Sequence, residues 1–450
     1  MRKGRIVENS FRVAFITLGC KVNSHETEGM RTLFEAAGYR SVPEDAAADV
    51  YVINTCTVTN TGDRKSRQMI RRSRSLNPSA IVAAVGCYAQ VASNEVAVLT
   101  GADLVLGNNQ KHRIVELVEE LAGKPSRAGG QIAVMPREEM TGFEALPIDD
   151  FKGQSRAFIK IQDGCDRFCS YCVIPLARGP VRNRHMADVL AEVSRLSKKG
   201  FREMVLTGIH LTSFQNEQGE EGLTALVRAL EEMDGIRRIR FGSLEPAFLT
   251  EPFLDTLAGS RKFCPHFHLS LQSGSDAILR RMNRHYSPDA FRGIVQAVRA
   301  RFPDASVTTD VMVGFPGETA KEFEASLAFC ASVGFSWMHV FPYSPRRGTP
   351  AATWPDQVPK SVKDFRAAQM RQLAEEMRTA FQRTFIGREM PVHFEQEVPE
   401  KPGWMEGFTT NYIQVAVPAV LFRPGDCFMV RLDESLGDRM QGTLIMQEKE

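Results

Sequence analysis

The sequence lacks the features of a membrane or exported protein. No apolar run reaches the about 18 residues that span a bilayer, and the first fifteen residues hold neither the apolar segment nor the small-residue cleavage site of a signal peptide. Neither sign of charge is in excess, because 56 Lys and Arg face 54 Asp and Glu, a formal net charge of +2. We therefore expect a cytoplasmic protein that does not enter membranes.

Low complexity and internal repeats are also missing. The 450 residues are 43% hydrophobic and 24% charged, a composition that excludes disorder as the dominant state. At roughly 150 residues per domain, this length predicts about three domains.

Cysteine is present in an odd number. The nine cysteines lie at positions 20, 56, 87, 165, 169, 172, 264, 330 and 427. Cytoplasmic thiols stay reduced, so we expect metal or cluster ligation rather than a disulfide framework. Cys330 in a helical pattern and Cys427 in a terminal strand are expected to be small core residues, and Cys264 receives no role.

Two series of alternating strands and helices predict an α/β fold. Apolar runs at 13–18, 50–55, 81–86 and 102–107 predict a parallel sheet domain over residues 1–122. Gly, Pro and charge without periodicity predict a linker at 123–150. The second series predicts a partial (β/α)6 barrel over 151–383, with its working face at the carboxyl ends of the strands. Its expected strands lie near 156–162, 203–208, 236–243, 266–272, 306–314 and 337–343.

The barrel domain is followed by a small β-barrel. A charged helix is expected at 360–385, and the short strands within 384–450 are separated by Pro, Gly and Asn. This last segment holds six Lys or Arg against eleven Asp or Glu.

A tight cysteine triplet follows the first barrel strand. In GCDRFCSYC, Cys165, Cys169 and Cys172 lie close enough to converge on one soft metal centre. Zinc would prefer a fourth nearby ligand, and none is obvious. Three cysteines on a cubane iron-sulfur cluster would leave one iron free to bind a substrate.

A second triplet is spread along the first domain. Cys20, Cys56 and Cys87 each directly follow one of its first three strands. Because the carboxyl ends of neighbouring parallel strands meet at one edge, we expect these three thiols to share a crevice and hold a second cluster.

These motifs resemble those of a known family. GCDRFCSYCVIPLARG is similar to the CxxxCxxC loop of radical S-adenosylmethionine enzymes, and more narrowly to the methylthiotransferases; LGCKVN, NTCTVT and GCYAQ match their amino-terminal motifs. The resemblance implies two 4Fe-4S clusters and S-adenosylmethionine. One cluster would bind and cleave that cofactor to a 5'-deoxyadenosyl radical, and the auxiliary cluster would hold the transferred sulfur. The terminal barrel resembles the RNA-binding TRAM domain.

Contacts to the cofactor are expected at the barrel strand ends. The resemblance also implies contacts from the aromatic residue beside Cys172, from the glycine after the second barrel strand and from the DVMVGFPGET segment. The candidates are Tyr171, Gly208, Ser243, Glu245, Ser270, Gln272, Asp310, Gly314 and Phe315. Glu318 suits a helix cap as well as a ligand. No metal role is expected for His210, His266, His268 or His339.

Two basic segments flank the cysteines and suggest a polyanionic substrate. One holds Arg64, Lys65, Arg67, Arg71, Arg72 and Arg74, and the other holds Arg178, Arg182 and Arg184. Contact with RNA phosphates is one interpretation, and a solvated helix face is the other. The acidic terminal barrel is expected to use shape or aromatic side chains, at Phe394, Trp404, Phe408 or Tyr412.

Within the family, Lys21-Val22 favours the branch that acts on N6-threonylcarbamoyladenosine-37 in the tRNA anticodon stem-loop, because the isopentenyladenosine branch typically has Gln-Met there. The alternatives are isopentenyladenosine or a ribosomal-protein aspartate as substrate, or a non-catalytic iron-sulfur protein that binds RNA or senses redox state. The expected partners are tRNA and an electron donor such as flavodoxin or ferredoxin, with a monomeric enzyme.

Overall fold

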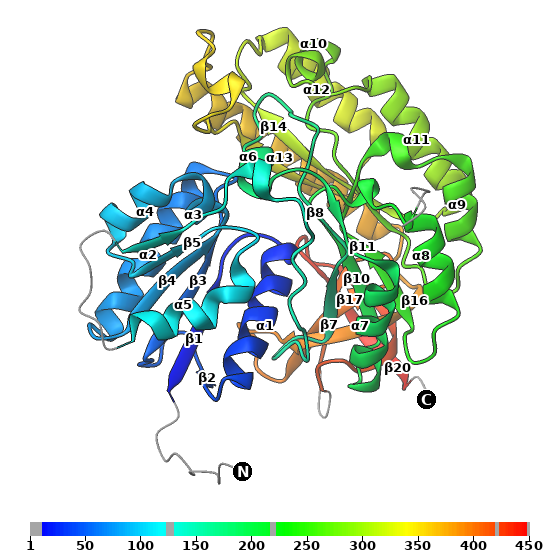
Figure 1. Cartoon of the computed structure of the whole chain (residues 1–450). Helices are drawn as coiled ribbons and strands as arrows, with labels where there is room; N and C mark the ends of the chain where they lie inside the picture. The colour runs from blue at the N-terminus through cyan, green and yellow to red at the C-terminus, as the bar shows by residue number, and fades with distance from the viewer. Residues whose placement is uncertain (1–10, 123–129, 217–221, 419–422, 448–450) are drawn as a thin grey trace.

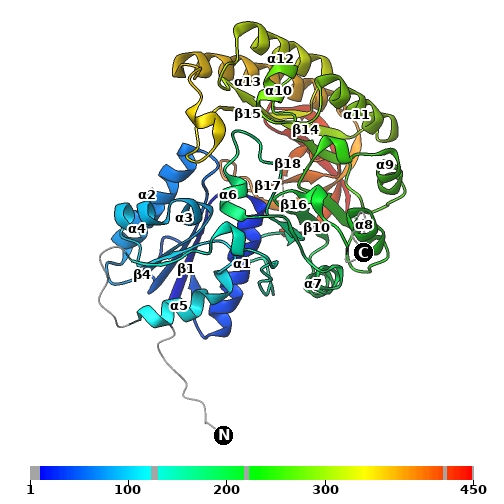
Figure 2. The same cartoon turned by 45° about the horizontal axis from the view of Figure 1, so that its top comes forward.

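The computed structural model describes residues 11–122, 130–216, 222–418 and 423–447. Figures 1 and 2 show the sheet domain (blue to cyan) beside the larger barrel domain (green to yellow). No helix in the described residues is long and apolar enough to cross a membrane.

The amino-terminal domain is a six-stranded parallel sheet with the order β2-β1-β3-β4-β5-β6. Its strands are β1 Arg12–Thr17, β2 Arg40–Val42, β3 Val50–Thr55, β4 Ile81–Gly86, β5 Leu104–Leu106 and β6 Gln131–Ala133. Its helices are α1 Lys21–Ala36, α2 Asn60–Leu76, α3 Cys87–Val91, α4 Ser93–Thr100 and α5 Ile114–Leu121. Helices cover both faces, which is why β3 is buried along its whole length.

Part of the predicted linker belongs to this domain. The range 123–150 contains β6, which pairs with β5, so the prediction of a linker throughout is wrong; its residues 123–129 lie outside the described part. Leu146 and Ile148 are buried, and a Cβ on Gly29 of α1 would lie 2.5 Å from the Leu146 Cβ. Three-residue strands such as β2 and β6 are too short to show a period, so the sequence pattern did not reveal them.

The second domain is the predicted partial barrel of parallel strands. Its strands are β7 Arg156–Lys160, β10 Glu203–Thr207, β11 Arg238–Phe241, β12 Ser243–Leu244, β13 His266–Leu269, β14 Ser306–Val313 and β15 Trp337–Pro342. Its helices are α7 Met186–Lys198, α8 Gly222–Glu231, α9 Glu251–Ala258, α10 Asp276–Arg281, α11 Pro288–Arg301, α12 Ala320–Val333 and α13 Lys360–Arg383. The loop after β7 adds the short hairpin β8 Gln162–Asp163 and β9 Arg182–Asn183, with α6 Ile174–Arg178 between them.

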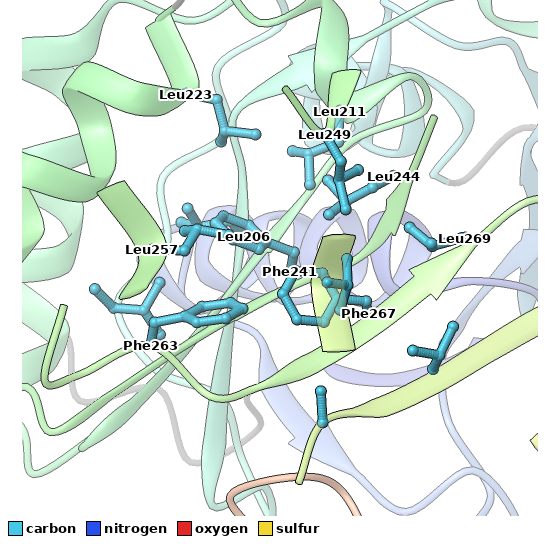
Figure 3. Close-up of a cluster of buried hydrophobic side chains, with 14 of the residues drawn as sticks. Leu206, Leu211, Leu223, Phe241, Leu244, Leu249, Leu257, Phe263, Phe267 and Leu269 are labelled. Atoms are coloured by element: carbon cyan, nitrogen blue, oxygen red, sulfur yellow. The ribbon is translucent and has the colours of Figure 1, made fainter. Parts of the chain in front are cut away.

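The core of the barrel domain lies between its strands and their covering helices. Figure 3 shows Phe241 and Phe267 of the strands together with Leu257 of α9, all fully buried. Cys264 and Cys330 are buried as well, in agreement with a structural role for Cys330.

The carboxyl-terminal segment is a closed five-stranded barrel with the order β16-β17-β18-β20-β19. Its strands are β16 Glu389–Glu397, β17 Trp404–Thr409, β18 Gln414–Pro418, β19 Cys427–Ser435 and β20 Met440–Gln447. It lies against the amino ends of the large-barrel strands, where Arg238 donates to the Phe408 carbonyl at 3.2 Å and Arg240 to the Thr410 carbonyl at 3.0 Å. The cysteine loops lie at the opposite, carboxyl ends.

A buried carboxylate holds this contact together. Glu203 is 1% exposed and pairs with Arg240 at 2.9 Å, and with Arg156 and Arg238 at 3.7 Å each. Burial alone would raise the pKa of Glu203, but the Arg240, Arg156 and Arg238 charges outweigh it and lower the pKa to about 2.

Replacing Glu203 by Gln is expected to lower the free energy of unfolding by roughly 3 kcal/mol at pH 7, because buried guanidinium charges lose their partner. The folded-state pKa lies below the unfolded value of about 4.3, so the ion pairs stabilise fully above that value and lose their effect as the pH falls toward 2. The denaturant midpoints of wild type and Glu203→Gln should therefore differ by a constant amount from pH 7 to about pH 5 and approach each other as the pH falls from about 4 toward 2. The exposed Glu120→Gln is the matched control, and a constant difference at all pH values would contradict the assignment.

Candidate active site

The three spread cysteines come together at the carboxyl edge of the amino-terminal sheet. Cys20 is the N-cap of α1, Cys56 follows β3, and Cys87 opens α3 directly after β4. A Cβ on Gly19 would lie 3.1 Å from the Cys56 Sγ, so the first two loops touch. Burial, with a smaller contribution from the neighbouring thiols of Cys87 and Cys20, raises the pKa of Cys56 to about 11. The three thiols are thus close enough to repel one another when ionised.

Polar side chains surround this triplet. Asn108 donates to the Cys87 Sγ at 3.7 Å, and Arg178 of α6 donates to the same sulfur through Nε at 3.2 Å. Arg178 also donates to Glu26 Oε1 at 2.5 Å and to Asn23 Oδ1 at 2.6 Å, both on α1. One arginine of the barrel domain therefore contacts a cysteine and a helix of the sheet domain.

The segment that follows the second triplet is not an exposed basic surface. Arg178, Arg182 and Arg184 are 0%, 4% and 8% exposed. Arg182 pairs with Asp163 at 3.5 Å, and Arg184 pairs with Glu192 at 2.9 Å. The prediction that these three arginines face RNA is therefore wrong. Their carboxylate partners, Glu26, Asp163 and Glu192, lie outside this basic segment, so local charge alone overstated their exposure.

The second triplet lies on the loop that joins β8 to α6. Burial, with a smaller contribution from the adjacent thiols, raises the pKa of Cys165 to about 11 and that of Cys172 to about 12. The Cys172 amide donates to the Cys169 carbonyl at 2.9 Å, and the Cys165 amide donates to Gly179 at 3.1 Å. Gly164 has φ +76°, and a Cβ there would lie 1.8 Å from the Pro180 carbonyl oxygen, so the start of this loop requires glycine.

The donor sets suit iron-sulfur clusters better than single ions. Each triplet offers three sulfurs, and the structure, over its described ranges, groups no three His, Cys, Asp or Glu side chains closely enough for one metal ion. A cluster of several bridged irons accepts thiolates that are farther apart. Arg284 supports the second triplet, because its Nη1 lies 3.6 Å from the Cys169 Sγ and its Nη2 lies 2.8 Å from Glu245. The residues present therefore fit two clusters.

A cavity of about 890 Å³ extends from the first triplet into the large barrel. Cys20 and Lys21 line one end, and Phe408 and Tyr412 of the small barrel line another part. Three of the predicted cofactor residues line it: Gly208, Ser243 and Asp310.

Other predicted cofactor residues are engaged by the protein. Glu245 pairs with Arg284, as described above. The Ser270 carbonyl accepts from the Tyr286 hydroxyl at 2.6 Å. Gln272 has φ +69° and is 7% exposed, and its Oε1 is buried without a hydrogen-bond partner in the described residues. Gln272 does not line the cavity, so this structure brings only its backbone and buried side chain close to the strand end.

The DVMVGFPGET turn forms an aromatic core. Phe315 is 0% exposed and packs edge-on against Tyr343 and Trp354 at 5.4 and 5.7 Å, with Tyr171 at 6.4 Å. This burial leaves its side chain no face for the predicted cofactor contact. The Gly314 amide, at φ +68°, donates to Glu318 at 3.0 Å, and Glu318 pairs with Arg366 of α13 at 2.7 Å. Glu318 thus fixes the turn.

Helix α2 carries the exposed positive charge near the first triplet. Arg64, Lys65, Arg71 and Arg72 are exposed. Arg67 instead donates to the Tyr88 hydroxyl at 2.6 Å, and Arg74 pairs with Asp103. About two thirds of the basic side chains on this helix therefore remain open to solvent.

Several residues of the site escaped the sequence reasoning. Lys21 was used only to choose a branch, although it follows Cys20 directly and lines the cavity. His266 and His268, two apart on β13, line the cavity with His339. Tyr412 was predicted for RNA contact but stacks on His266 inside, with ring centroids 4.4 Å apart. The spacing of two residues between His266 and His268 already indicated that both side chains lie on the same face of a strand. Only the folded barrel shows that this face lines the cavity.

Comparison with known proteins assigns two regions. Residues 12–107 match the model of an uncharacterized protein family, UPF0004, and residues 159–330 match that of the radical SAM superfamily. The structure resembles that of the radical S-adenosylmethionine methyltransferase TsrM from Kitasatospora setae, with a TM-score of 0.56, 16% identity and coverage of 76% of this chain and 77% of that one.

Relatives match nearly the whole chain. A threonylcarbamoyladenosine tRNA methylthiotransferase, MtaB, of Bacillus subtilis is 37% identical over 406 residues, which cover 90% of this chain and 89% of the relative. MtaB of Aquifex aeolicus is 38% identical, with coverage of 84% and 92%. The tRNA-2-methylthio-N(6)-dimethylallyladenosine synthase of Cereibacter sphaeroides is 34% identical, with coverage of 95% and 97%.

Alanine at Cys87 and alanine at Cys165 are each expected to remove one cluster. Anaerobically reconstituted wild type should hold about eight irons per chain, and each variant about four fewer. Iron quantitation with electron paramagnetic resonance measures this, and Cys330→Ala is the matched control because Cys330 is a buried core thiol. Full iron content in either ligand variant would contradict the two-cluster assignment.

Proposed function

Because the chain belongs to the tRNA methylthiotransferase family of radical SAM enzymes, we propose that it converts N6-threonylcarbamoyladenosine at position 37 of tRNA to its 2-methylthio derivative. Enzymes of this class use S-adenosylmethionine and 4Fe-4S clusters. Overall sequence identity does not distinguish the two tRNA branches, because a relative named as a dimethylallyladenosine synthase is also 38% identical to this chain. The observation that supports the threonylcarbamoyl branch is Lys21-Val22 directly after Cys20, in place of Gln-Met.

Both triplets would be held by the chain's own loops. Cys20, Cys56 and Cys87 would hold the auxiliary cluster, while Cys165, Cys169 and Cys172 would hold the cluster that binds S-adenosylmethionine. When bound, these groups supply one-electron chemistry together with the sulfur and methyl groups that are transferred. Arg178 keeps the Cys87 loop against the barrel domain, because it contacts the Cys87 sulfur and Glu26 at once.

The cavity can receive the modified base. It reaches the loop of Cys20 at one end, and the polar strand-end residues Gly208, Ser243 and Asp310 line it. The small barrel covers the amino ends of the large-barrel strands through the Arg238 and Arg240 hydrogen bonds, which limits the access of water from that side.

The exposed face of α2 is proposed to bind the phosphates of the stem-loop. This helix begins four residues after Cys56, so Arg64 and Lys65 lie within its first two turns near the auxiliary triplet. Positive side chains release counterions when they contact phosphates, which gives affinity without base specificity.

Nucleoside analysis of tRNA tests the substrate. In cells that lack the gene, tRNA should contain threonylcarbamoyladenosine without its 2-methylthio form, and the wild-type gene should restore that form. Cys165→Ala should not restore it, because the radical-generating cluster would lose a ligand. Appearance of the 2-methylthio group only on isopentenyladenosine would place the enzyme in the other branch.

The double variant Arg64→Gln/Lys65→Gln should bind the stem-loop more weakly and with a shallower salt dependence. Each lost phosphate contact should reduce the slope of log K against log salt by about 0.7 to 0.9. Fluorescence anisotropy at several salt concentrations measures both values. Lys198→Gln/Lys199→Gln, at exposed positions at the end of α7, is the matched control. Equal slopes in all three proteins would exclude α2 from the RNA interface.

A further inference from the structure

The cavity contains a lysine that forms no ion pair with the described residues; burial lowers its pKa, while the nearby Tyr412 and Glu203 act in the opposite direction. Lys21 is the first residue of α1 and lines the cavity beside Cys20. Within the described part of the chain, no hydrogen bond or ion pair engages its ammonium group. The other charged groups of the cavity wall have partners: Asp310 pairs with His268 at 3.3 Å, Asp438 with Arg439 at 3.0 Å, and Arg378 with Glu375.

Histidines form the wall that faces Lys21. Burial chiefly lowers the pKa of His339; His268 and Lys21 lower it as well, and Asp310 acts in the opposite direction. Burial likewise holds the pKa of His266 well below its ordinary value, with Arg240, His268 and Lys21 adding to the effect. Burial therefore favours the neutral form of both rings, and Lys21 lies near enough to act on each of them.

One atom of this wall lacks a partner. The Thr308 hydroxyl lies 3.0 Å from His266 Nε2 and 3.0 Å from His268 Nδ1. His266 Nδ1 is buried, and no hydrogen bond reaches it from any described residue. A buried nitrogen without a partner costs free energy, so a polar ligand group beside it would be stabilising.

Aromatic rings complete the wall. The Tyr412 ring stacks on His266 at 4.4 Å with an interplanar angle of 3°, and Phe408 stacks on Tyr412 at 4.5 Å. Arg240 and Arg156 lie over the Tyr412 ring, 4.7 and 5.6 Å from its centroid, and fix its position. The small barrel thus supplies part of the cavity.

We propose that this part of the cavity is a subsite for a carboxylate on the N6 substituent of the base, with Lys21 as its counter-ion and His266 as a hydrogen-bond partner. The inference rests on the proposed function and deepens it. A threonylcarbamoyl group carries a carboxylate, a hydroxyl and urea polar atoms, whereas a dimethylallyl group has none. An apolar substituent would leave the Lys21 charge and the His266 nitrogen unpaired, so the subsite would discriminate against it.

The test compares substrates that differ only in charge. Reconstituted holoenzyme is given an anticodon stem-loop with threonylcarbamoyladenosine, and the same stem-loop with that carboxylate as its neutral methyl ester. Wild type should act on the acid with a kcat/KM roughly 10- to 150-fold above that on the ester, the range expected for a hydrogen bond to a charged group. Lys21→Met should lower kcat/KM for the acid by a similar factor and leave that for the ester nearly unchanged, and Lys21→Arg should retain part of the preference.

Two measurements separate a failed subsite from a damaged protein. Iron content and the affinity for an unmodified stem-loop should be the same in wild type and Lys21→Met. If Lys21→Met lowers turnover of acid and ester equally, Lys21 serves the neighbouring Cys20 site and the inference is overturned. Equal activity of wild type on acid and ester would overturn it as well. If wild type modifies only isopentenyladenosine stem-loops, the proposed function itself fails, whatever the behaviour of Lys21.

Discussion

The buried guanidinium of Arg178 is the interaction on which the arrangement of the two cysteine triplets depends. It is fully buried, and its partners come from both domains: Glu26 and Asn23 on α1, Asp163 on β8, and the Cys87 sulfur. Buried charges are tolerated only when they are well paired. Separating the two domains would therefore leave the Arg178 guanidinium and the Glu26 carboxylate without each other, which costs free energy. The arginine sits at the end of α6, between the two cysteine loops, and so ties one to the other.

The two ends of the large barrel have different chemistry. Its carboxyl ends carry thiols and polar loops, as in other parallel barrels with functional sites. Its amino ends meet the small barrel around Glu203, where three guanidiniums hold the carboxylate ionised. Tyr412 of the acidic terminal domain lines the cavity and stacks on His266, so this domain contributes an aromatic ring to the cavity wall.

Much of the fold followed from local pattern. The strands β1, β3 and β4 and the barrel strands lie within a few residues of their apolar runs, because buried parallel strands are apolar on both faces. The strands β2 and β6 escaped, since three residues show no period. The exposure of Arg182 and Arg184 was predicted wrongly for a related reason: an arginine in a basic run looks exposed until its carboxylate partner outside that run is known.

The sequence by itself determined the class of chemistry. The spacing of three thiols in one loop depends only on local geometry, and three thiols that follow neighbouring parallel strands must meet at one edge of the sheet. Tertiary structure decided the rest. Packing between domains buries Arg178 against Glu26 and brings Lys21, His266 and Tyr412 to one cavity, and packing within the barrel domain encloses Phe315 among aromatic rings. Lys21, His266 and Tyr412 lie far apart in the sequence. Whether a charge in a low-dielectric cavity has a partner depends on such distant neighbours, which no local pattern specifies.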